Sequence, residues 1–234
     1  MLEVKDLNTF YGEFQALHDV SISVGDSEFV VTFGPNGHGK STMLKTICGL
    51  ITPTSGSIIF DGQEISKRPT HNLVGMGIVY IAEDRHLFPQ LSVMNNLRLG
   101  AYNDKAHPKE AENLERVFEL FPKLKKFANR RAETLSGGEA RMLAIGRGLM
   151  SNAKFLAIDE PSLGLAPNLR AEVFEKIKDI NKSGITILMV EQDITEASEY
   201  ADRIYLMEDG RIVFDGTEEE VFKNEHVREV FLGI

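Results

Sequence analysis

The chain has 234 residues, of which 42% are apolar and 26% are charged, so it can bury a core without disulfide staples. This composition excludes a disordered chain, a coiled coil and a collagen-like fibre. A formal net charge of −9 argues against a general nucleic-acid scaffold, and the single cysteine, Cys48, excludes a disulfide framework or a cysteine-built zinc site.

The first ninety residues are rich in strand patterns. Short segments either alternate apolar and polar side chains, as half-buried strands do, or are apolar throughout, as buried strands are. These segments are residues 2–7, 18–24, 28–33, 57–60 and 77–81. A helix pattern over 41–50 follows a glycine-rich loop, so a strand, a loop and a helix come in succession there.

From about residue 88 to residue 150 the patterns are helical, and after that strands and helices alternate. Later strands are expected at 155–158, 185–190, 203–207 and 211–214, with a helix at 168–181 and an acidic amphipathic helix at 215–231. We predict one α/β domain, residues 1–234. Its core, about 1–87 and 151–234, carries an N-terminal antiparallel β subdomain, and an α-helical subdomain is inserted at about 88–150.

The glycine-rich loop fits the pattern G-x-x-x-x-G-K-[ST] of phosphate-binding loops. Its glycines let successive backbone N–H groups turn toward a phosphate, and the following helix directs its positive dipole end at the same place. We expect Lys40 to reach the β- and γ-phosphates and the Ser41 hydroxyl to bind Mg²⁺. The predicted nucleotide-binding residues of this segment are Gly34, Pro35, Asn36, Gly37, His38, Gly39, Lys40, Ser41 and Thr42.

A second candidate site follows the apolar run 155–158, which ends in two carboxylates, Asp159 and Glu160. A buried strand that places Asp159 at its carboxyl end suits Mg²⁺ binding, directly or through water. Glu160 would point to the other side, where it could act as general base toward a water that attacks the γ-phosphate. Such a strand end is usually only solvated, but behind a phosphate-binding loop the catalytic interpretation is favoured.

Residues 135–139 read LSGGE and open a further helix pattern. Ser136 with Glu139 three residues later fits a capping box, which would make the segment a well-capped helix start and nothing more. Alternatively, Ser136 and the amides of Gly137 and Gly138 face a γ-phosphate at this helix start. The spacing alone does not decide between the two.

The phosphate-binding loop, LSGGE and FLAIDEP, in this order, resemble the ATP-binding cassette (ABC) ATPases over essentially the full chain. The resemblance implies a P-loop NTPase (RecA-like) fold, ATP and Mg²⁺ as ligands, and a head-to-tail dimer. In that dimer Ser136, Gly137, Gly138 and Glu139 contact the ATP held by the partner. It also implies that Tyr11 stacks on adenine, the alternative being an ordinary core or surface tyrosine.

Two positions depart from the general family pattern. Glu83 stands where the family usually has a Gln that senses Mg²⁺ and contacts the membrane subunit, and Gln192 stands where it usually has a switch His. Because Gln can donate an amide N–H to a γ-phosphate oxygen but cannot be protonated, we expect Gln192 to keep the contact without a pH-sensitive group. Ala140–Arg141 also stands where Gln is common after LSGGE.

Within the family, the run PSLGLAP and the pair Glu191–Gln192 resemble the smaller of the two ATPase subunits of high-affinity branched-chain amino acid uptake systems. This implies an ATP-hydrolysing importer subunit on the cytoplasmic face of the membrane, peripheral because no apolar run approaches the roughly 18 residues of a membrane span. Its implied partners are two transmembrane permease subunits, a second ATPase subunit or a copy of itself, and an extracytoplasmic substrate-binding protein, with no nucleic acid.

Two alternatives remain open at this point. One is the ATPase of an exporter, such as a lipopolysaccharide-extraction system, whose compact subunits look similar. The other is a non-transport ABC ATPase. Proteins of that kind usually have long coiled-coil inserts or two fused cassettes, and neither fits in 234 residues.

Overall fold

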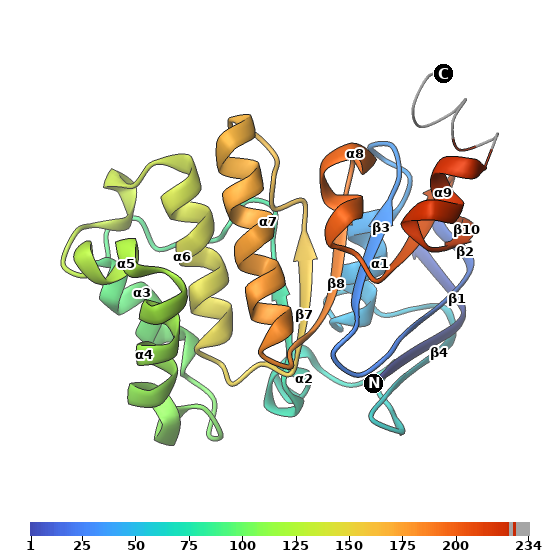
Figure 1. Ribbon diagram of the computed structural model, residues 1–234. Helices are drawn as coiled ribbons and strands as arrows, with labels where there is room; N and C mark the ends of the chain where they lie inside the picture. The colour runs from blue at the N-terminus through green and yellow to red at the C-terminus, as the bar shows by residue number, and fades with distance from the viewer. Residues whose placement is uncertain (225–226, 228–234) are drawn as a thin grey trace.

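In the computed structural model, which describes residues 1–224 and 227, two sheets stand side by side with helices around them (Figure 1). The first sheet is antiparallel, with strand order β2-β1-β4-β5. Its strands are β1 (Leu2–Tyr11), β2 (Phe14–Val24), β4 (Ser55–Phe60) and β5 (Gln63–Glu64). Both β1 and β2 are longer than predicted, because irregularities in their pairing after Val4 break the alternation on which the prediction rested.

The second sheet has six strands in the order β10-β9-β3-β8-β7-β6, all parallel except β10, which is antiparallel to β9. They are β3 (Phe29–Phe33), β6 (Ile78–Ile81), β7 (Phe155–Asp159), β8 (Thr186–Glu191), β9 (Arg203–Glu208) and β10 (Arg211–Gly216). Every residue of β3, β7 and β8 is buried. Since β3, β8 and β7 are parallel neighbours, their carboxyl ends meet at one edge of the sheet.

Helices cover both faces of the six-stranded sheet (Figure 1). The α-helices are α1 (Lys40–Ile47), α2 (Thr70–Met76), α3 (Val93–Gly100), α4 (Glu110–Leu120), α5 (Pro122–Lys126), α6 (Gly137–Leu149), α7 (Pro167–Lys182), α8 (Ile194–Ala197) and α9 (Glu218–Lys223). Helices α3 to α6 gather on the side of the molecule away from the antiparallel sheet. The predicted α/β class, with an antiparallel β subdomain and an inserted helical segment, is confirmed. No helix in the described part of the chain is long and apolar enough to span a bilayer.

The side chains of β7 show how the sheet is buried on both faces. Phe155 and Ala157 belong to the hydrophobic cluster that includes Leu44 of α1, whereas Leu156 and Ile158 belong to the cluster that includes α6 and α7. Because side chains alternate along a strand, Asp159 continues the row that faces α1.

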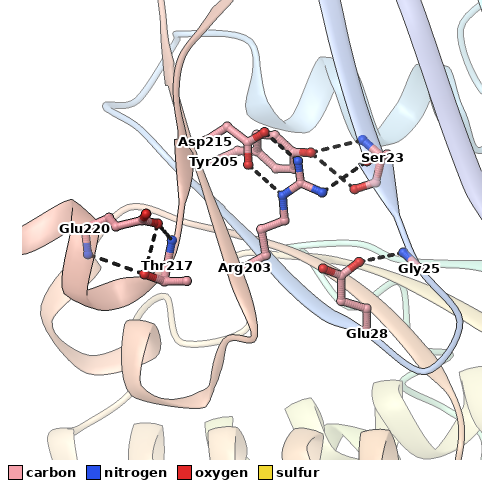
Figure 2. Close-up of polar contacts among 8 residues, drawn as sticks. All are labelled: Ser23, Gly25, Glu28, Arg203, Tyr205, Asp215, Thr217 and Glu220. Carbon is pink, nitrogen blue, oxygen red and sulfur yellow. Dashed lines mark hydrogen bonds and ion pairs between the residues drawn. The ribbon is translucent and has the colours of Figure 1, made fainter.

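The predicted acidic helix at 215–231 is wrong at its start. Asp215 ends up in β10, where both carboxylate oxygens accept hydrogen bonds from Arg203 of β9 (Figure 2). The helix begins only after Thr217, which forms a reciprocal capping box with Glu220. Helix α9 ends at Lys223, and residues 225–226 and 228–234 of the predicted helix lie outside the described residues.

The same region links the two sheets. Arg203 also donates from Nη1 to the Ser23 hydroxyl of β2 at 3.1 Å, and the Tyr205 hydroxyl contacts both backbone groups of Ser23 (Figure 2). The antiparallel sheet is therefore held against β9 by polar contacts of buried or half-buried side chains.

A prediction concerns the crossing of α3 and α6. A Cβ on Gly100 would lie 2.0 Å from the carbonyl oxygen of Arg147, so Gly100→Ala should lower the free energy of unfolding by about 2–3 kcal/mol. The matched control is Gly75→Ala in α2, where a Cβ meets no atom within 4 Å and should stabilise by up to about 1 kcal/mol. Chemical denaturation measures both, and equal stabilities of the two variants would contradict the prediction.

Candidate active site

The loop between β3 and α1 approaches neighbouring backbone so closely that glycine is required. A Cβ on Gly34 would lie 2.3 Å from the Met207 carbonyl oxygen, and one on Gly39 would lie 2.9 Å from the Ala16 carbonyl oxygen. Gly39 also has φ +100°, a left-handed conformation that favours glycine. The loop is thus packed tightly against β2 and β9, and it leads directly into the start of α1, where a helix N-terminus favours an anion.

Lys40 lies at the base of this loop with only 3% of its surface exposed. Its Nζ donates to the carbonyl oxygens of Gly34 (2.7 Å) and Pro35 (3.1 Å) and lies 3.3 Å from Oε1 of Glu160. The buried ammonium therefore has one carboxylate partner and two neutral ones. A phosphate that enters the loop would therefore compete with the Glu160 carboxylate for this buried cation.

The carboxylate of Asp159 is held by two hydroxyl groups from different elements. Ser41 Oγ of α1 donates to Oδ1 at 2.8 Å, and the Tyr80 hydroxyl of β6 donates to Oδ2 at 2.6 Å. Burial, followed by this hydrogen bond, raises the pKa of Tyr80, so its phenol stays a donor. Tyr80 was not predicted from the sequence, although a lone hydroxyl in the apolar run IVYI, next to the last residue of the strand, was a usable signal.

The Ser41–Asp159 pair is also the place that fits a divalent cation. No group of three or more His, Cys, Asp or Glu side chains that could hold a metal ion exists among residues 1–224 and 227. Mg²⁺ commonly takes one or two protein oxygens and completes its shell with phosphate oxygens and water. One hydroxyl and one carboxylate beside a phosphate loop match that requirement.

Glu160 follows directly after β7 with φ +41°, a left-handed conformation that is uncommon for a residue other than glycine. Its N–H donates to the Val190 carbonyl, and its side chain is directed to Lys40. A hollow next to it is lined by Glu160, Ser162, Leu163, Gly164, Arg170, Glu191, Gln192, Asp193 and Ile194. The structure thus brings Gln192, the first residue after β8, to the same hollow as Glu160.

Glu191 is a buried carboxyl group in this hollow that the sequence analysis did not assign to the site. It is 3% exposed, and burial raises its pKa to about 7, although the Ser162 N–H that donates to it at 2.9 Å opposes this shift. The negative charge of Glu160 adds to the raised pKa.

The other predicted residues lie around this centre. Tyr11, at the end of β1, is half exposed, and its hydroxyl is 3.4 Å from the Thr42 hydroxyl of α1. His38 accepts the Asp209 N–H on Nδ1 at 2.9 Å and so ties the loop to the β9–β10 turn. Asn36, Gly37 and Glu83 have exposed side chains or backbone at the surface.

The LSGGE segment lies elsewhere in the same chain. Ser136 caps α6 and forms a reciprocal capping box with Glu139, so that part of the prediction is confirmed. In Figure 1, α7 and β8 lie between α6 and α1. Gly137 is exposed and Gly138 is buried at this helix start. In the described part of the chain, the side chain of Ser136 is hydrogen-bonded to Glu139 and to no residue of the phosphate loop.

Comparison with known proteins gives consistent relatives. The family model described as "ABC transporter" matches residues 17–163. The chain is 43% identical, over 100% of both proteins, to the high-affinity branched-chain amino acid transport ATP-binding protein BraG of Pseudomonas aeruginosa. It is 37% identical to the probable branched-chain amino acid transport ATP-binding protein LivF of Archaeoglobus fulgidus, over 100% of this chain and 99% of that one. It is also 32% identical to the lipopolysaccharide export system ATP-binding protein LptB of Haemophilus influenzae, over 100% of this chain and 97% of that one.

Solved structures agree with these relatives. An ATP-binding cassette of an ABC transporter superposes with a TM-score of 0.89 at 30% identity, covering 99% of this chain and 98% of that one. A dimeric ATP-binding cassette in a post-hydrolysis state, bound to ADP and Pi, superposes with a TM-score of 0.78 at 28% identity, covering 93% and 98%.

The buried Glu191 carboxyl generates a prediction about stability and pH. Between its ordinary pKa of 4.5 and about 7, the unfolded chain releases this proton and the folded chain keeps it, so folding stability falls as pH rises through that window. Glu191→Gln removes this loss. The free energy of unfolding of the variant minus that of the parent should therefore be about 2–3 kcal/mol larger at pH 8 than at pH 5. Urea unfolding at both pH values measures it, with the exposed Glu115→Gln as control. An equal difference at both pH values would refute it.

Proposed function

The chain belongs to the ATP-binding subunits of ABC transporters, and from this premise we propose that it is the ATPase of an importer of branched-chain amino acids. The observation that supports branched-chain amino acids as the transported substrate is the 43% identity with BraG over the full length of both chains. The run PSLGLAP and the pair Glu191–Gln192 support the same subfamily. As a family member, the chain is an ATPase and binds ATP.

The contacts that Lys40 makes within the chain suggest how ATP binding prepares the site for ATP hydrolysis. Bound ATP supplies the scissile γ-phosphate, and Mg²⁺ would neutralise part of its charge. When Lys40 turns its ammonium to phosphate oxygens, Glu160 loses the cation that it now holds at 3.3 Å. The freed carboxylate is then available to accept a proton from water, as the general base. The same Lys40 thus binds the substrate and releases the base.

We place Mg²⁺ at Ser41 and Asp159, with Glu83 as a third candidate from the turn after β6. The support is the pair of hydroxyl donors on Asp159, which fixes the direction of both carboxylate oxygens before any ion binds. Glu83 has an exposed side chain, so its contribution depends on how its turn moves when ATP is present.

A dimer would complete the site. Ser136 and Gly137 are exposed at the start of the 13-residue helix α6, where backbone N–H groups and the helix dipole favour an anion. We propose that Ser136, Gly137, Gly138 and Glu139 contact the ATP of the partner subunit, which is a second ATPase subunit or another copy of this chain. The dimeric form of one structural neighbour supports this arrangement.

The membrane partners need a surface of their own. Phe88, Leu99 and Tyr102 are large apolar side chains with 51%, 44% and 89% of their surface exposed. Leu99 lines three hollows: one is shared with Phe88, and the other two are shared with Tyr102. Exposed apolar patches of this kind mark interaction sites. We propose that two transmembrane permease subunits dock here on the cytoplasmic face, in a system that includes an extracytoplasmic substrate-binding protein.

A lipopolysaccharide exporter is the second candidate. The observation in its favour is the 32% identity to LptB, which also spans nearly the full length of both chains. The two candidates share the ATP chemistry and differ in the membrane proteins that accompany the chain.

The co-purifying partners test this proposal. Glu160→Gln should bind ATP but hydrolyse it at least about 100-fold more slowly than the parent, because it lacks the general base. Purified from detergent-solubilised native membranes in ATP, this variant should retain two permease subunits and a second ATPase subunit. Lys40→Ala lacks the ammonium that binds the phosphates, so it should retain fewer of these partner subunits.

The outcomes separate the candidates. Leucine-stimulated uptake by the recovered complex would support the importer. Recovery of a single ATPase species with an export complex would overturn the cargo and leave the ATPase intact. A Glu160→Gln variant that still hydrolyses ATP would remove Glu160 from its proposed role.

The Gln192 position provides a further prediction. If its amide donates to the γ-phosphate, Gln192→Ala should reduce kcat by roughly 10- to 100-fold with a much smaller change in ADP affinity. Gln192→His should restore activity and add a pH dependence near the histidine pKa of about 6.5. Unchanged hydrolysis in Gln192→Ala would show that the residue is not used.

A further inference from the structure

Arg141 is the largest of the fully buried side chains, with 1% of its surface exposed. It lies in the second turn of α6, five residues after Ser136, at a position where the family commonly has Gln. No carboxylate lies within ion-pair distance of it among residues 1–224 and 227, and its Nε has no hydrogen-bond partner. A buried guanidinium of this kind carries a large desolvation cost that a neutral side chain would avoid.

The two terminal nitrogens of Arg141 reach two different turns. Nη1 donates to the Ala82 carbonyl oxygen at 3.2 Å, and Nη2 donates to the Glu160 carbonyl oxygen at 3.3 Å. Each carbonyl is the first in a turn, since it also accepts the N–H three residues later, of Arg85 and Leu163 respectively. One side chain therefore joins the turn after β6, the turn after β7 and helix α6.

Both turns carry residues of the proposed site. The first contains Glu83, and the second begins at Glu160, whose backbone has the left-handed φ of +41°. Burial lowers the pKa of the Arg141 guanidinium to about 10, and nearby carboxylates, Glu191 first among them, oppose this. The side chain thus remains a cation at neutral pH and a donor to both carbonyls.

We propose that Arg141 is a positioning residue for ATP hydrolysis, which holds the Glu160 turn and the 82–85 turn in a fixed position relative to α6. This inference rests on the proposed ATPase function of the site. Because Ser136 at the start of α6 faces the partner's nucleotide in that proposal, Arg141 also connects that contact to the general base of its own chain.

A positioning role and a structural role make different predictions. If Arg141 is removed, neither carbonyl is orphaned, because each keeps its backbone donor. The costly unpaired Nε also disappears. Arg141→Met should therefore shift the unfolding midpoint by less than about 3 °C. It should nevertheless lower kcat at least about tenfold and leave the affinity for ADP within about twofold, since misplacement of a base affects chemistry more than binding.

Arg147 offers a matched control on the same helix. It donates to the carbonyl oxygens of Arg85 and His86 at 3.0 and 2.7 Å, so it holds the first turn without reaching Glu160. Arg147→Met should change kcat by less than about threefold. Arg141→Lys, which keeps the charge but has one nitrogen for two carbonyls, should lie between Arg141→Met and the parent.

The experiment combines steady-state ATP hydrolysis, ADP binding, thermal unfolding and hydrogen exchange on the full chain. In Arg141→Met we expect faster hydrogen exchange at the amides of both Arg85 and Leu163. In Arg147→Met we expect faster exchange only in the first turn, at Arg85. The inference is overturned if kcat stays within twofold of the parent or falls only in proportion to ADP affinity. If Arg141→Met does not fold, Arg141→Lys decides by the same criteria. A parent chain that hydrolyses no ATP would instead refute the proposed function.

Discussion

The ion pair between Lys40 and Glu160 exists because β3 and β7 end at the same edge of one parallel sheet, with β8 between them. The strand order carries the phosphate loop after β3 and the two carboxylates after β7 to this edge, although about 120 residues separate them in the chain. A buried ion pair contributes little net stability, because desolvation of both partners offsets their attraction. In the proposed mechanism, Lys40 gives up this contact for a phosphate, and Glu160 gives it up for a water molecule.

The charge balance of the site follows from the same burial. Asp159, Glu160 and Glu191 are buried carboxyl groups, and the buried cations beside them are Lys40 and Arg141. Glu191 relieves part of this excess, because burial raises its pKa to about 7 and favours its neutral form. A nucleotide triphosphate adds further negative charge to the same space. If ATP binds here as proposed, the Lys40 ammonium and an accompanying divalent cation would offset that added charge.

The sequence predicts the parts of this site that depend on local chemistry. A phosphate loop needs glycines, a lysine and a hydroxyl at fixed, closely spaced positions, so the segment from Gly34 to Ser41 can be recognised without a structure. The capping box at Ser136 can be recognised in the same way. Tyr80 and Arg141 contribute through partners 79 and 19 residues away in the chain. A local pattern can single out Tyr80, but it cannot identify the partner of either residue. The predicted helix at 215–231 began too early because Asp215 pairs with Arg203 across a hairpin, a tertiary contact that overrides its helix-like sequence.

The turn after β6 connects the proposed site to the exposed Phe88. It starts at Ala82, passes through Glu83, takes left-handed backbone at Arg85 (φ +66°) and His86 (φ +43°), and leads to the exposed Phe88. Strained backbone persists only where its surroundings hold it, and here the holders are hydrogen bonds from two arginines of α6. Arg147 also lies over the Phe88 ring, 5.9 Å from its centroid. Any movement of α6 relative to the sheet must therefore change the position of this turn, of the Glu160 carbonyl and of Phe88 together, because the same helix holds all three.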